Sequence, residues 1–134
     1  MLIQWTDDLS VGVKEIDEQH KIFLNILNDL CDTSCSLHPI SEIASILKQL
    51  TSYASFHFAT EEKYFDKFNY ELSTEHKEEH NKLLTKVTEF NQIFINEGDA
   101  ILPELLDFLE DWLIDHLSGQ DKKYTKCFHD HGLV

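Results

Sequence analysis

The chain has 134 residues, of which 42% are hydrophobic, and it carries a formal net charge of −14. This length suits one domain with a substantial core, and a total of four Gly and two Pro favours a helical protein over a disordered or all-β one. The acidic charge argues against nucleic acid and anionic membranes as partners, and no apolar run reaches the ~20 residues that a bilayer span needs.

Four segments repeat their apolar residues with the period of an α-helix. The predicted helices cover approximately residues 17–36, 41–68, 73–97 and 100–118. Residues 1–16 precede them as an arm that we expect to pack across the helices, and residues 119–134 follow as a C-terminal segment. Asp17 is the predicted N-cap of the first helix, and Gly98 and Gly119 are natural helix stops.

The connections between these helices are short, which makes consecutive helices antiparallel neighbours. No strand-like alternation competes with the helical period, and no internal repeat is visible. The sequence therefore predicts an all-α, antiparallel up-down-up-down four-helix bundle with an N-terminal arm, formed by residues 1–134 as a single domain.

Five histidines and two carboxylates follow the ordered pattern H…HxxxE…HxxxH…HxxxxD. They are His20, His57, Glu61, His76, His80, His116 and Asp121. Residues four apart lie on one face of a helix, so each such pair can point at one place. Seven ligands are too many for one ion and a natural number for two. A mixed nitrogen and oxygen set also suits iron better than a structural zinc, which is complete with four ligands.

The positions of these residues along the helices strengthen the metal hypothesis. Most of them continue the apolar stripes, so they should point into the bundle, where an unpartnered charge or imidazole costs several kcal/mol. His20 lies near the start of the first helix, and His57 and Glu61 lie late in the second. The third helix begins with His76 and the fourth ends with His116, so all these levels coincide at one end of an antiparallel bundle.

His116 and Asp121 pose a geometric problem, because five residues of an ideal α-helix leave two side chains ~140° out of phase. Both can face inward only if the helix is interrupted between them. We expect Ser118 and Gly119 to end the helix and fold the chain back, which would require the backbone freedom of Gly119.

The ordered motifs resemble those of the bacterial hemerythrins over essentially the whole chain. The matching segments are IDEQH at 16–20, HFATE at 57–61, HKEEH at 76–80, WLIDHL at 112–117 and DKKY at 121–124. The resemblance implies a non-haem di-iron centre that binds O2 reversibly. It assigns a six-coordinate iron to His76, His80 and His116, and an iron with an open position to His20 and His57. Glu61, Asp121 and an oxo or hydroxo group would bridge the two ions.

The same resemblance suggests roles for residues around the centre. Trp112, Leu113 and Leu117 match the apolar lining beside the open iron, although the same residues would also serve as ordinary core. Tyr124 would either hydrogen-bond near Asp121 or only pack. The remaining histidines, in a predicted loop and in the C-terminal tail, are expected to be solvent-exposed; they are His38, His129 and His131.

Three cysteines occur, at positions 31, 35 and 127, and their odd number indicates reduced thiols. Cys31 and Cys35 would lie one helical turn apart, at a Cβ separation of about 5–6 Å. A disulfide needs about 3.8 Å between these atoms, so we interpret them as semi-buried helix residues rather than a bridge, a redox switch or a soft-metal pair. The first residues lack the basic and apolar regions of a signal peptide, so we expect a cytoplasmic protein.

The resemblance favours an O2-binding protein for storage, transport or delivery, not an enzyme. NO and small anions such as azide are further ligands that such a site would accept, and no particular O2-recipient protein is indicated. The alternatives are a di-iron peroxidase or NO-handling enzyme on the same site, and an O2 sensor module that acts through a separate partner.

Overall fold

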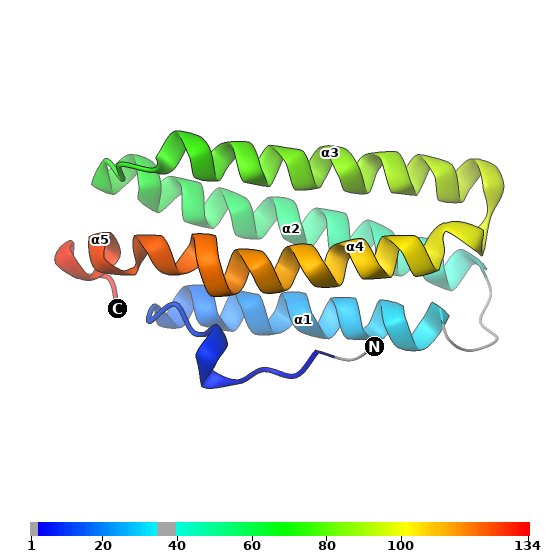
Figure 1. Cartoon of the computed structure of the whole chain (residues 1–134), viewed down its shortest axis with the longest axis horizontal. Coiled ribbons are helices and arrows are strands. Elements are labelled where there is room, and N and C mark those ends of the chain that lie inside the picture. Colours follow the sequence, from blue (N-terminus) through cyan, green and yellow to red (C-terminus); the bar gives the residue numbers. More distant parts are fainter. Residues whose placement is uncertain (1–2, 35–39) are drawn as a thin grey trace.

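The computed structural model describes residues 3–34 and 40–134, and all regular structure in these ranges is helical. The four long helices are α1 (Lys14–Ser34), α2 (Ile40–Phe68), α3 (Ser73–Glu97) and α4 (Leu102–Asp115). Each packs against the next, and α4 packs against α1, so the four helices close into an antiparallel bundle (Figure 1). This arrangement confirms the predicted up-down-up-down fold.

Short helical segments complete the chain. They are η1 (Asp7–Leu9), η2 (Asp99–Ile101), the π-helical η3 (His116–Gln120), η4 (Asp121–Tyr124) and α5 (Thr125–Asp130). In Figure 1, α5 continues roughly along the line of α4 at one end of the bundle, and the N-terminal arm runs along the outside of α1.

Two apolar cores hold the helices together. The larger one fills most of the bundle with one stripe from each long helix, and Leu30, Leu50, Leu83 and Leu105 are among its fully buried members. Each such leucine contributes about 1.5–3 kcal/mol by leaving water. The smaller, largely aromatic core joins α5 and the arm to the end of α2; its buried members are Val11, Val13, Ile16, Phe65, Tyr70, Tyr124 and Phe128. On α2 the larger core ends at Phe58 and the smaller begins at Phe65, which leaves one polar layer between them.

The first helix begins at Lys14, three residues before its predicted start, so Asp17 is not its N-cap. Asp17 lies within the first turn, where one carboxylate oxygen accepts a hydrogen bond from the Val11 N–H at 2.9 Å and the other from the Ser10 hydroxyl at 2.5 Å. The prediction missed the earlier start because Lys14 and Glu15 are exposed and add nothing to the apolar stripe. The predicted end of this helix at residue 36, Cys35 and His38 lie outside the described residues.

The end of α4 differs from the prediction more instructively. The chain does not fold back after His116 but continues through the π-helical turn η3 into η4 and α5. The Asp121 N–H donates to the His116 carbonyl, a bond that spans five residues and places Asp121 back over His116. The predicted mismatch in phase is therefore removed by a wider turn of helix, not by a break.

Gly119 consequently does not need the backbone freedom that we expected of it. The glycines with positive φ are Gly12, Gly98 and Gly132, and Gly119 is not among them. A Cβ added at Gly119 would meet no atom of the described chain within 4 Å.

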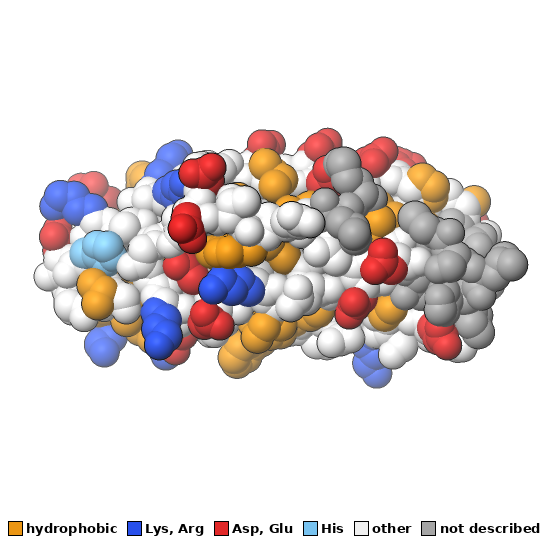
Figure 2. Space-filling view, turned by 90° about the horizontal axis from the view of Figure 1, so that it is seen from below, with side chains coloured by type: hydrophobic (Ala, Val, Ile, Leu, Met, Phe, Trp, Pro, Cys, Tyr) orange, Lys and Arg blue, Asp and Glu red, His pale blue; other side chains and the backbone are white. Residues whose placement is uncertain are grey.

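The arm is fastened at both of its ends. Ile3 exchanges two backbone hydrogen bonds with the Asn28 amide, at 2.9 and 2.8 Å. Near α1, the Thr125 hydroxyl donates to the Val11 carbonyl at 2.6 Å, which ties the arm to α5. Acidic side chains are scattered along the face shown in Figure 2 rather than gathered in one patch. Among the described residues, no helix has the length and apolar character needed to cross a bilayer.

The different conformations of Gly119 and Gly98 predict opposite effects of the same substitution. Gly119→Ala should raise the free energy of unfolding by about 0.5–1 kcal/mol, because alanine restricts the unfolded chain and fits the native helical backbone. Gly98→Ala should lower it by more than about 1 kcal/mol, because φ is +89° at this position. Thermal unfolding followed by circular dichroism measures both; a loss of stability in Gly119→Ala would contradict the helical assignment of η3.

Candidate metal centre

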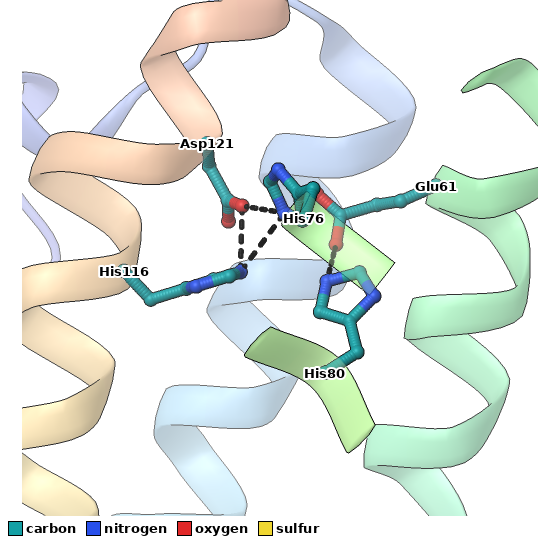
Figure 3. A group of neighbouring side chains, drawn as sticks. All are labelled: Glu61, His76, His80, His116 and Asp121. Atoms are coloured by element: carbon teal, nitrogen blue, oxygen red, sulfur yellow. Dashed lines mark hydrogen bonds and ion pairs between the residues drawn. The ribbon is translucent and has the colours of Figure 1, made fainter. Parts of the chain in front are cut away.

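The polar layer between the two cores contains all seven predicted donor residues. Their side chains are between 0 and 4% exposed and come from α1, α2 and α3 and from the turns η3 and η4 that follow α4. Figure 3 shows five of them: His116 and Asp121 project from successive turns of one stretch of chain toward Glu61, His76 and His80. The structure therefore brings together residues that are up to 101 positions apart, from His20 to Asp121.

Each of the two carboxylates lies among imidazole nitrogens. Oδ1 of Asp121 lies 2.9 Å from Nε2 of His76 and 2.8 Å from Nε2 of His116, and Oδ2 lies 3.0 Å from Nε2 of His20. The other carboxylate contacts the remaining imidazoles.

Glu61 is this other carboxylate. Its Oε1 lies 3.3 Å from Nε2 of His57 and 3.1 Å from Nε2 of His80. All five imidazoles thus direct Nε2 to the interior of the layer, which is the atom that each would use to bind a common ion.

These donors form two overlapping groups that could each hold a metal ion. One contains Glu61, His76, His80, His116 and Asp121, and the other contains His20, His57, Glu61 and Asp121. Within each group the donor atoms lie within 4.8 Å of one another. The two groups share both carboxylates, which is the arrangement that a pair of adjacent ions bridged by carboxylates requires.

Several of these atoms lack the bonds that burial demands. Nε2 of His20, His57 and His80, Oε1 of Glu61 and both Asp121 oxygens find no hydrogen-bond partner among the described residues. Nε2 of His20 lies 3.0 Å from Oδ2 of Asp121, and Nε2 of His57 lies 3.3 Å from Oε1 of Glu61, but neither pair has the alignment of a hydrogen bond. Buried polar atoms that converge without bonding cost free energy, and cations at their centre would satisfy them. The residues present therefore fit a metal centre.

The outward-facing nitrogens of two imidazoles are held by residues that the sequence reasoning missed. Nδ1 of His57 lies 2.7 Å from Oε1 of Gln19, and Nδ1 of His80 lies 2.8 Å from Oε2 of Glu62. The Gln19 amide in turn donates to the Thr60 hydroxyl at 3.3 Å. An N–H at Nδ1 that donates to these oxygens leaves the Nε2 lone pair directed inward. Gln19 and Glu62 adjoin donors in the sequence, but they contact histidines of other helices, so spacing did not reveal them.

Tyr124 is a full member of the site. Its hydroxyl donates to Oε2 of Glu61 at 2.5 Å, and its side chain is completely buried. Of the two alternatives left open by the sequence, a hydrogen bond near Asp121 or packing alone, a hydrogen bond forms, but its acceptor is Glu61. Burial and the nearby carboxylate of Glu61 raise the pKa of Tyr124 well above its ordinary value, which keeps the hydroxyl protonated as a donor.

The electrostatics of the layer keep both carboxylates ionised. Burial and the Asp121 charge would raise the pKa of Glu61, but His57 and His80 outweigh them and the pKa falls below its ordinary value. The pKa of Asp121 is likewise lowered despite burial, mainly by His116. Burial lowers the pKa of His20, which favours the neutral, ligating form of its imidazole. Burial would also lower the pKa of His116, but Asp121 outweighs it and raises the pKa above its ordinary value. Metal binding needs ionised carboxylates and neutral imidazoles, so an ion bound by His116 would displace a proton from it.

A small void lies beside the group that contains His20 and His57. Its remaining lining is mostly apolar and includes the predicted residues; it consists of Phe23, Phe58, Trp112, Leu113, His116, Leu117 and Asp121. The void has no room for a water molecule. Leu113 and Leu117 also belong to the larger core, so the two interpretations of these residues are compatible.

Flat ring stacking fixes the walls of the layer. Phe58 stacks on His80 at 3.8 Å between ring centroids, and Trp112 stacks on His116 at 4.3 Å. The histidines outside the layer that the structure describes, His129 and His131, are exposed as expected. His129 contacts the Gly12 carbonyl at 2.7 Å and so helps to hold the arm.

Comparison with known proteins agrees with this geometry. Residues 11–127 match the family described as the hemerythrin HHE cation binding domain. A bacteriohemerythrin of Clostridium acetobutylicum is 32% identical over 124 residues, covering 90% of this chain and 96% of its own. A bacteriohemerythrin of Stenotrophomonas maltophilia is 31% identical, covering 92% and 80%, and a hemerythrin-like protein of Naegleria gruberi is 34% identical, covering 90% and 88%.

Among solved structures, a wild-type hemerythrin superimposes with a TM-score of 0.88 at 31% identity and covers 95% of this chain and 98% of its own. The family match spans most of the chain and contains every one of the seven donors. The chain belongs to the hemerythrin family.

Proposed function

We propose that this protein binds O2 reversibly at a non-haem di-iron centre held by the seven buried donors, for oxygen storage, transport or delivery. The observation that carries the proposal is the pair of overlapping donor groups that share Glu61 and Asp121. Membership of the hemerythrin family and the similarity to bacteriohemerythrins support the choice of iron and of O2.

The division of donors would make the two irons unequal. One would receive His76, His80 and His116, and the other only His20 and His57, with Glu61 and Asp121 shared between them. With one shared oxo or hydroxo bridge, the first would be six-coordinate and the second would keep an open position. The second group adjoins the apolar void, so the open position would face apolar side chains, which would have to move apart to admit O2.

When bound and reduced, a di-iron centre supplies two electrons to O2 and recovers them when O2 leaves. The surrounding residues would make this exchange reversible. Gln19 and Glu62 hold His57 and His80 in the tautomers that ligate through Nε2, and the Tyr124 hydroxyl orients Glu61. Leu113 and Leu117 exclude water, which would otherwise deliver protons that promote irreversible oxidation.

The composition of the donor set favours binding over oxidation chemistry. Di-iron carboxylate proteins of the ferritin type combine four Glu with two Glu-associated His, whereas this layer combines five His with two carboxylates. Fewer anionic ligands make high-valent iron less accessible, which is the state that an oxidase or peroxidase needs.

Anaerobic reduction of the iron-loaded protein followed by O2 titration tests the proposal directly. We expect one O2 per two irons, with an optical band that persists in air and disappears on deoxygenation. Metal analysis of the same sample gives the stoichiometry. A single bound ion would contradict the di-iron centre. Rapid decay of the band with turnover of peroxide or NO would contradict an O2 carrier and favour an enzyme.

Removal of a single donor should disable the centre. His80→Ala or Glu61→Ala is expected to lower the iron content below two per chain and to abolish the optical band, because each leaves an ion short of a buried ligand. His129→Ala is the matched control, since this exposed histidine lies outside the layer. Iron analysis after gel filtration makes the comparison; full retention of iron in either donor variant would refute the ligand assignment.

Polarity introduced beside the void should shorten the life of the O2 complex. Leu113→Asn is expected to accelerate autoxidation by about tenfold or more, because it admits water next to the open position. Leu109→Asn is a suitable control: Leu109 is equally buried in the same helix, one turn before Leu113, and does not line the void. Autoxidation is measured as the decay of the optical band; equal rates in the two variants would argue against a role for Leu113 in excluding water.

A further inference from the structure

Metal ions have to reach donors that are at most 4% exposed. The apolar void and a surface cleft of about 230 Å³ both touch these donors. The cleft, here called the α3–η3 cleft, is lined by Glu79 of α3, by Trp112 and Asp115 of α4, and by the following residues His116, Gly119, Gln120 and Lys123. The cleft has room for water molecules, whereas the void has none.

The two cavities differ in what they can admit. A hydrated divalent ion would have to shed water against Phe23, Leu113 and Leu117 to cross the void, which offers no oxygen ligand before the centre itself. The α3–η3 cleft offers the carboxylates of Glu79 and Asp115, and carboxylate oxygens replace water around a hard cation. The net charge of −14 further concentrates cations near such a cleft.

His116 connects the cleft to the centre, because its side chain lines both. It is the most exposed of the seven donors, at 4%. Its Nε2 lies 2.8 Å from Oδ1 of Asp121, and beyond it the Asp121 oxygens and Nε2 of His80 have no hydrogen-bond partner in the described chain. A cation at the base of the cleft is therefore one imidazole away from unsatisfied buried ligands.

We propose that the α3–η3 cleft is the docking site and uptake route for ferrous ions, with Glu79 and Asp115 as the first oxygen contacts and His116 as the first donor of the centre to receive the ion. The inference rests on the proposed di-iron function and adds to it separate routes for metal ions and for O2. Charged ions reach the layer through the polar cleft and O2 through the apolar void, and Trp112 and His116 line both.

The rate at which metal-free protein takes up metal tests this route without any measurement of O2 binding. Ferrous ion, or cobalt(II) as a spectroscopic probe, is mixed anaerobically with the protein, and absorbance gives the initial rate while metal analysis gives the final content. The double variant Glu79→Gln/Asp115→Asn should load roughly tenfold more slowly at low ionic strength and still reach two ions per chain. The control Glu78→Gln/Asp111→Asn removes the same charge from exposed positions on the same two helices that do not line the cleft.

A change of the opposite sign should act in the opposite direction. Lys123→Gln removes a positive charge from the cleft and should accelerate loading, whereas Lys122→Gln, which removes the same charge at an exposed position outside the cleft, should not. At 1 M salt, where the Debye length is about 3 Å, these differences should shrink. Gly119→Leu places a side chain in open space at the cleft and should slow loading by obstruction at any salt concentration.

The outcomes separate the two proposals. Slow loading in the cleft variants alone, with a final content of two ions, supports the route. Loading of Glu79→Gln/Asp115→Asn at the rate of the unmodified protein, or equal slowing in its control, overturns the route and leaves the di-iron proposal intact. Failure of the unmodified protein to bind two ions overturns the di-iron proposal itself.

Discussion

The rest of the structure depends on one constraint: two ionised carboxylates, Glu61 and Asp121, are completely buried between two apolar cores. Each carboxylate is tolerated there because imidazoles surround it, and those contacts hold its pKa low in spite of burial. Even so, the layer leaves converging donor atoms unsatisfied in the described chain. Such a layer lowers the stability of the fold unless cations complete it. The atoms that destabilise the bundle are therefore the ones that we propose bind the metal.

The polar layer is kept in order from outside. Gln19 and Glu62 fix two imidazoles through their outer nitrogens, Tyr124 fixes one carboxylate, and Phe58 and Trp112 hold two rings flat. Tyr124 belongs both to the layer and to the aromatic core that anchors α5 and the arm. The C-terminal segment thus contributes to the layer through Tyr124 and also holds the arm through Thr125.

The layer also has two unlike sides. A void lined by leucine and phenylalanine side chains lies next to His20 and His57, and a more polar cleft lies beside Glu79; Trp112 and His116 line both. We propose that ions enter by the cleft, because the void offers no oxygen ligand that would replace their water before they reach the centre. This asymmetry follows the unequal division of donors, three imidazoles against two, about the shared carboxylates.

Helical periodicity and the spacing of seven donors were enough to predict the bundle, the end of it at which the donors meet and the residues that compose the layer. Those features depend on the local geometry of single helices and on short connections, both of which are written in the order of residues. The widened turn that returns Asp121 over His116, the bonds of Gln19 and Glu62 to histidines of other helices, and the choice of Glu61 by Tyr124 were decided only by the tertiary structure. They depend on the rotation and axial shift of one helix against another, which the packing of the whole core determines and no local spacing encodes.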